Sequence, residues 1–78
     1  MGLSDLPLDK GTVHQKVFEA FGWVLRRAGE HIVMTHPSHS GVTLSIPNHR
    51  EVRRGTLHSL VRSASLTDKQ YRAMYDSL

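Results

Sequence analysis

The sequence contains no cysteine, so it offers neither a disulfide framework nor a thiolate metal site. The fold must therefore be held together by packing alone. This is demanding at 78 residues, a length near the lower limit at which a hydrophobic core suffices without cross-links. The same length leaves room for a single domain, and the lack of cysteine fits a reducing compartment.

Long apolar runs are also missing, because no stretch of about 18 apolar residues occurs. The first ten residues, MGLSDLPLDK, contain acids and a proline where a secretory signal has basic residues and then an apolar stretch. We therefore expect a cytoplasmic protein. Ten Lys and Arg oppose seven Asp and Glu, a net charge of +3, and seven of the ten cations are arginine. This balance favours phosphate-bearing partners without requiring them.

The N-terminal quarter of the chain is expected to hold a leader and a helix. Residues 1–11 contain proline and glycine without periodicity, which predicts a flexible leader before a single domain over residues 12–78. Thr12 followed by Gln15 has the spacing of a capping box and predicts a helix that Gly22 ends. The apolar face of this helix would carry Val13, Val17, Ala20 and Phe21.

Three strands are expected in the middle of the chain. Residues 23–26 and 31–36 have β-propensity and are separated by an Ala28-Gly29 turn, so they predict a hairpin. After a connection at residues 37–41, apolar and polar residues alternate over residues 42–46 until Pro47. This alternation predicts a third strand with one buried face.

The C-terminal part is expected to be helical. From Gly55-Thr56 onward, helical spacing relates Leu57, Leu60, Val61 and Ala64. Thr67 and Gln70 have capping-box spacing and open a short last helix carrying Tyr71, Met74, Tyr75 and Leu78. The order is α-β-β-β-α plus a tail helix. It predicts an α+β fold in which a three-stranded antiparallel sheet has two helices on one face and solvent on the other.

His31 begins the second predicted strand, in the stretch GEHIVMTH. Ile32 and Met34 alternate with His31, so if this apolar pair faces the helices, His31 lies on the open face of the sheet. Trp23, beside Gly22, is instead expected in the core.

Three pieces of sequence carry a resemblance to a known family. They are Gly22-Trp23 at the end of the first helix, Gly-x-His at the start of the second strand, and Ile-Pro-x-His followed by Gly-Thr-Leu. In this order and at these spacings, residues 12–75 resemble the HicA family of toxin mRNA interferases, also called YcfA-like proteins.

The resemblance implies a fold similar to a double-stranded-RNA-binding domain. It also implies a ribonuclease that cleaves mRNA and arrests growth until a HicB-like antitoxin binds it. The single catalytic histidine of the family corresponds to His31. Where the family motif often has serine this chain has Glu30, which leaves open whether the activity is tuned or lost.

RNA cleavage without a metal or cofactor needs a base for the 2′-hydroxyl and an acid for the departing 5′-oxygen. Imidazole suits either role because its unperturbed pKa is about 6.5. His31 is therefore the candidate catalytic residue, and His49 and His36 are candidate supporting residues. Candidate RNA contacts are Arg26, Arg27, Arg53 and Arg54.

Other functions stay open at this point, among them a purely structural or interaction protein. A domain of this topology, or a toxin homologue silenced by Glu30, would bind RNA without cutting it. His36 and His39 have a short His-x-x-His spacing, but without cysteine this is a weak metal signal, and we expect no metal. If the chain is a toxin, an acidic antitoxin is expected to cover its cationic face and His31.

Overall fold

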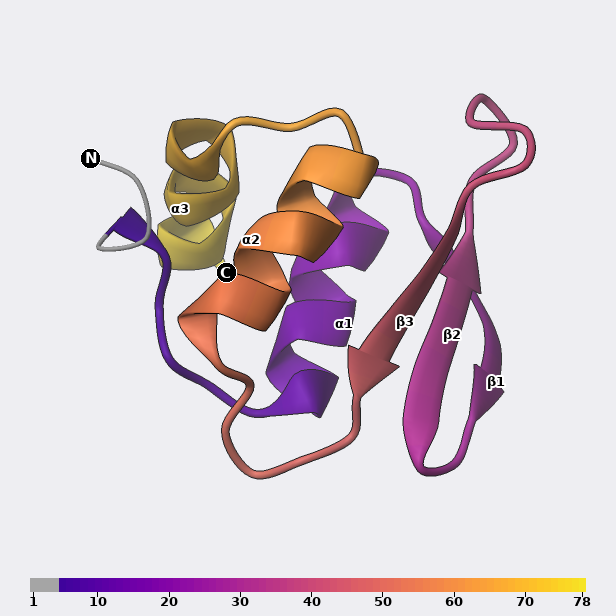
Figure 1. Cartoon of the computed structure of the whole chain (residues 1–78). Helices are drawn as coiled ribbons and strands as arrows, with labels where there is room; N and C mark the ends of the chain where they lie inside the picture. The colour runs from indigo at the N-terminus through magenta and orange to yellow at the C-terminus, as the bar shows by residue number, and fades with distance from the viewer. Residues whose placement is uncertain (1–4) are drawn as a thin grey trace.

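The computed structural model describes residues 5–78, which form a three-stranded antiparallel sheet and three helices. The strands lie in the order β1-β2-β3, and the helices gather on one side of the sheet (Figure 1). No helix in this part of the chain has both the length and the apolarity to cross a membrane. The predicted α+β fold is confirmed. The elements are α1 Gly11–Ala20, β1 Val24–Ala28, β2 His31–Thr35, β3 Thr43–Pro47, α2 Arg54–Ser63 and α3 Asp68–Ser77.

The hydrophobic core lies between the sheet and the two main helices. Helix α1 contacts all three strands, α2 contacts β3, and α3 packs on α1 and α2. Alternation along the strands supplies the sheet side of the core, because every second side chain of a strand points the same way. Its members are Ile32, Met34, Leu44 and Ile46. The helical spacing also predicted Leu57, Leu60 and Val61 of α2 and its C-terminal cap residue Ala64, and all four are buried.

The face of the sheet that turns away from the helices is the outer face. Strands β2 and β3 pair antiparallel, with Ile32 opposite Ile46 and Met34 opposite Leu44. Because these four side chains point into the core, the intervening residues of both strands point to the outer face. Strand β1 is an edge strand with a register irregularity between Leu25 and Arg27, and all five of its residues are exposed.

Helix α1 begins at Gly11, and its start differs from the prediction. The cap position is Lys10 without any side-chain cap, so the capping box predicted at Thr12 is wrong. The Gly11 N–H instead donates to the carbonyl of His49 at 3.0 Å. A long-range backbone hydrogen bond therefore satisfies an N–H group at the helix start, in place of the side-chain cap that was expected.

Residues 5–10, the described part of the expected leader, pack against the domain. Leu6 is fully buried within the core. The Asp9 carbonyl accepts a hydrogen bond from the Val52 N–H at 2.9 Å, and the Asp9 carboxylate accepts one from the Tyr75 hydroxyl at 2.6 Å. The packed part of the chain thus extends upstream of residue 12. Residues 1–4 lie outside the described residues.

Helix α3 is docked through an aromatic contact with α1. The predicted capping box of Thr67 and Gln70 is confirmed, with both reciprocal hydrogen bonds present. Tyr71 is fully buried against Phe18, and its hydroxyl forms a 2.7 Å hydrogen bond with Nδ1 of His14. His14 is itself fully buried. The core position of His14 was not predicted, although His14 lies three and four residues before the buried Val17 and Phe18.

Candidate functional site

His31 is the first residue of β2 and follows the tight turn formed by Gly29 and Glu30. Its neighbours Ile32 and Met34 are buried, whereas His31 is exposed. The predicted orientation is therefore confirmed: the imidazole lies on the outer face. An exposed imidazole at a strand entrance can meet a large substrate without any opening of the fold.

Asn48 ties the β3–α2 connection to this turn. Its side-chain Nδ2 donates to the Gly29 carbonyl at 2.8 Å, and its backbone N–H donates to the Glu30 carbonyl at 3.1 Å. Within the turn, the Gly29 N–H donates to the His31 carbonyl at 3.1 Å. This role of Asn48 was not predicted, and no local pattern signals it, because both partners lie far earlier in the sequence.

His49 lies at the same end of the fold as His31. Pro47 is the register partner of His31, and His49 follows it by two residues. The His49 side chain is exposed and borders two shallow depressions on the surface. Around these depressions lie Lys10, Arg50 and Arg53. Of the two supporting histidines predicted from the sequence, His49 is the one that the fold brings towards His31.

His36 lies at the opposite end of β2 from His31. Five residues at about 3.3 Å each separate them by roughly 16 Å along the strand. Both ring nitrogens of His36 have structural partners, since Nε2 bonds the Phe21 carbonyl at 3.1 Å and Nδ1 accepts from the Ser38 N–H at 3.0 Å. We conclude that His36 supports the loop structure and does not join His31.

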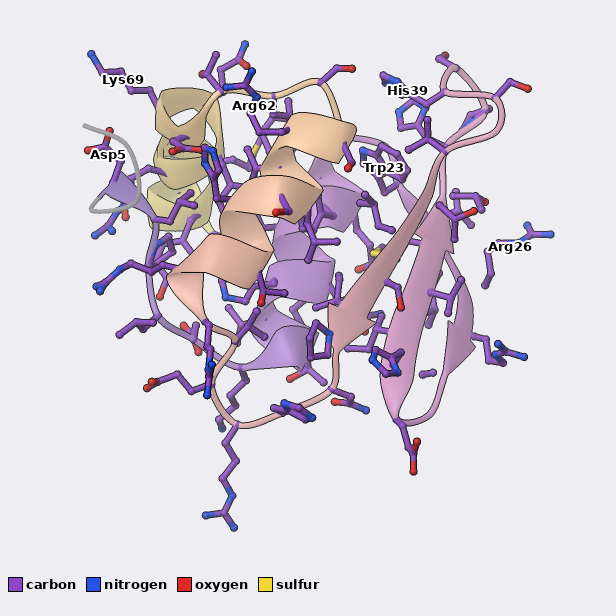
Figure 2. The ribbon with its side chains drawn as sticks, in the orientation of Figure 1. Asp5, Trp23, Arg26, His39, Arg62 and Lys69 are labelled. Atoms are coloured by element: carbon purple, nitrogen blue, oxygen red, sulfur yellow. The ribbon has the colours of Figure 1, made fainter. Side chains whose placement is uncertain are left out.

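An aromatic cluster surrounds His36. Trp23 is buried as predicted, stacks on His39 at a ring-centroid distance of 5.3 Å, and meets the His36 ring edge-on at 5.2 Å. Trp23 and His39 lie together at one end of the sheet (Figure 2). Position 22 next to this cluster requires glycine, because a Cβ there would lie only 2.7 Å from Nε2 of His36. Packing thus accounts for the His-x-x-His spacing, and no metal-binding group of three His, Asp or Glu side chains occurs within residues 5–78.

Arg26 and Arg27 lie on β1, next to the register irregularity. Arg27 is the register partner of Val33, so both point to the outer face together with His31. Arg27 lies one strand spacing from Val33, and Val33 is two residues along β2 from His31, so the Cα atoms of Arg27 and His31 are roughly 8 Å apart. Figure 2 shows that the Arg26 side chain extends away from the edge of the sheet. The irregularity thus lets neighbouring arginines project in different directions.

Arg53 and Arg54 lie at the start of α2. Arg53 is the cap residue, with no side-chain cap on the helix and no acid in its first turn. The first backbone N–H groups of α2 therefore favour an anion. Arg54 has one role in the fold, because its Nε donates to the Leu6 carbonyl at 2.8 Å. Arg53 is exposed and borders the same depression as His49.

The structure thus places the exposed His31 on the outer face with Arg27, and the exposed His49 two residues beyond the strand partner of His31. The family model described as HicA toxin of bacterial toxin-antitoxin matches residues 14–66, more than half of the chain. No curated protein matches the sequence. The chain belongs to the HicA toxin family, and is thus a toxin of a toxin–antitoxin system whose partner is an antitoxin.

Proposed function

We propose that this toxin is a metal-independent endoribonuclease that cleaves mRNA and arrests growth, with His31 as its general acid or base. The observation that carries the proposal is the placement of His31. The imidazole is exposed at the entrance of β2, on the same face as Arg27 and beside the segment that bears His49. Membership of the HicA toxin family supports the same reading.

The chemistry needs two proton transfers at one phosphodiester. The 2′-hydroxyl of the ribose attacks the adjacent phosphorus, and the bond from phosphorus to the 5′-oxygen breaks. One group takes the proton of the 2′-hydroxyl, and another gives a proton to the departing 5′-oxygen. The products are a 2′,3′-cyclic phosphate and a 5′-hydroxyl. His31 performs one of these transfers, and His49 is the candidate for the other.

The arginines supply charge for binding. Arg27 faces the substrate side together with His31, while Arg53 lies where the N-terminus of α2 also favours phosphate. Arg26 extends the charged surface beyond the sheet edge, and Arg54 adds charge at the start of α2. Cationic contacts of this kind also stabilise the extra negative charge of the transition state.

The experiment that tests the proposal compares the wild type with His31→Ala in RNA cleavage and growth arrest, with a chelator present. Because His31 is exposed, the variant should keep the wild-type circular dichroism and melting temperature. We expect cleavage to fall about 10²- to 10⁴-fold, the usual contribution of a positioned acid or base.

His58→Ala is the matched control, because it removes an imidazole beside Asp68 of α3, away from the turn. It should keep wild-type cleavage. Equal cleavage by the wild type and a folded His31→Ala would show that His31 is the wrong histidine. If neither protein cuts RNA and both bind it, the chain is a non-catalytic RNA-binding module. Glu30, beside His31, is then the first residue to test as the cause of the missing activity.

We further propose that the antitoxin is an acidic, HicB-like protein that covers the arginines and His31. The positive net charge and the exposure of β1 support this, since complementary charge speeds and orients association. Co-expression with the neighbouring reading frame should give a stable complex that does not cleave RNA. Recovery of free toxin alone would contradict the proposal.

A further inference from the structure

The turn before His31 is held from within by the hydrogen bond from the Gly29 N–H to the His31 carbonyl, and His31 itself pairs with Pro47 of β3. The turn joins β2 to β1, which is an exposed edge strand with an irregular register. Gly29 and Glu30 are both exposed, and a Cβ on Gly29 would meet nothing within 4 Å. The exposed backbone of the turn therefore leaves room for a further contact that holds it in place before His31.

Asn48 holds both carbonyls of that turn. The two hydrogen bonds, from Nδ2 to the Gly29 carbonyl at 2.8 Å and from the backbone N–H to the Glu30 carbonyl at 3.1 Å, come from one residue. Because both donors belong to one residue, they fix the orientation of the turn as well as its distance from the β3–α2 connection. The backbone bond is available to any residue except proline, whereas the side-chain bond requires a donor of the right length.

The same segment is anchored on its other side by α1. The carbonyl of His49 accepts from the N–H of Gly11 at 3.0 Å, and Gly11 lies close against the backbone of Pro47. Asn48 thus connects the turn before His31 to a segment that the N-terminus of α1 holds in place. The backbones that carry the two imidazoles, His31 and His49, are linked through this residue.

We propose that Asn48 is a positioning residue for the reaction: its side-chain amide holds the turn so that His31 stays in a fixed relation to His49. This rests on the proposed function, in which His31 performs a proton transfer. Asn48 does not itself touch the reacting atoms. Loss of the Asn48 amide should therefore slow the chemical step without lowering the affinity for RNA, because misplacing a catalytic group by about 1 Å can cost up to 10²-fold in rate.

The kinetic test uses single-turnover cleavage at saturating RNA, with binding measured separately on a substrate that lacks the reactive 2′-hydroxyl. Asn48→Ala should cut about tenfold more slowly than wild type and bind RNA within twofold of it. Asn48→Gln, which keeps an amide donor on a longer chain, should recover part of the rate. Gln15→Ala is the control, because it removes the exposed amide bond to Glu19 on α1 and should change neither quantity.

Nuclear magnetic resonance relaxation separates this proposal from the proposed function. In Asn48→Ala the backbone order parameters of Gly29, Glu30 and His31 should fall, whereas Gln15→Ala should leave them unchanged. Unchanged order parameters would overturn the positioning role even if cleavage falls. An unchanged rate in Asn48→Ala, or a loss of rate matched by an equal loss of binding, would overturn it too. A wild type that does not cleave RNA would instead refute the proposed function, and the order parameters would still decide whether Asn48 holds the turn.

Discussion

Gly11 lies directly against the backbone of Pro47, so that a Cβ added to Gly11 would come within 2.4 Å of the Pro47 carbonyl oxygen. This approach brings the first turn of α1 to the end of β3, and it lets the Gly11 N–H reach the carbonyl of His49. One glycine therefore sets how closely α1 can pack where β3 leads into the segment of Asn48 and His49.

Gly11→Ala should destabilise the protein. The added methyl group meets backbone rather than a movable side chain, and overpacking of this kind typically costs about 1–3 kcal/mol. Urea unfolding followed by circular dichroism measures the change. The control is Gly55→Ala at the start of α2, where a Cβ meets nothing within 4 Å, so the substitution should not destabilise the protein. Equal effects of the two substitutions would contradict this account of Gly11.

The buried pair of His14 and Tyr71 predicts a pH-dependent stability. Burial, partly opposed by the Asp9 carboxylate, lowers the pKa of His14 from 6.5 to about 4. Nε2 of His14 has no hydrogen-bond partner among residues 5–78. Between these two pKa values the unfolded chain binds the proton and the folded chain does not. The free energy of unfolding should therefore fall as the pH drops from 6.5 towards 4, by up to about 3 kcal/mol.

Thermal unfolding of the wild type and His14→Gln across this pH range tests the prediction. Glutamine retains a polar partner for the Tyr71 hydroxyl and cannot titrate, so its pH dependence should be flatter. The pKa of Asp9 is also lowered, mainly by its hydrogen bond from Tyr75. The stability that Asp9 contributes is lost only as the pH falls below its ordinary pKa of 3.8, so Asp9 does not account for a change between pH 6.5 and 4. Parallel slopes for wild type and His14→Gln would show that another group controls the dependence.

Local patterns in the sequence predicted most of the fold. Alternation placed Ile32 and Met34 inside and His31 outside, because strand period depends only on neighbouring residues. The capping box at Thr67 was correct because its two hydrogen bonds lie within one turn. The capping box at Thr12 was wrong because a residue far along the chain, His49, already supplies a partner at the helix start.

The site was predictable only in part, for the same reason. His31 followed from the family resemblance, but the sequence treated His36 and His49 as equal candidates. Only the register of β2 and β3 separates them, by placing the His49 segment beside the turn and His36 at the far end of the strand. Asn48 was missed because its partners, Gly29 and Glu30, lie 19 and 18 residues earlier, and no local pattern connects them.

Arg27 should contribute to RNA binding through one phosphate contact. Its register partner Val33 places it on the outer face with His31, and all five residues of β1 are exposed. In Arg27→Ala the slope of log affinity against log salt should become shallower by about 0.7, the value for one contact to single-stranded RNA. Arg72→Ala is the control, because Arg72 pairs with Asp76 on α3 at 3.1 Å. Identical salt slopes for wild type and Arg27→Ala would show that Arg27 makes no phosphate contact.

Glu30 should weaken RNA binding without controlling the fold. It is exposed in the turn before His31, and only its backbone carbonyl is engaged, by Asn48. A carboxylate about 6 Å from a phosphate in water repels it by about 0.7 kcal/mol, so Glu30→Gln should tighten binding roughly threefold at low salt. The gain should vanish near 1 M salt, where the Debye length is about 3 Å. Glu19→Gln on α1 removes the same charge away from the site and should leave binding unchanged. A gain that persists at high salt, or cleavage that appears only in the variant, would mean that Glu30 acts on the chemistry of His31 rather than on the approach of RNA.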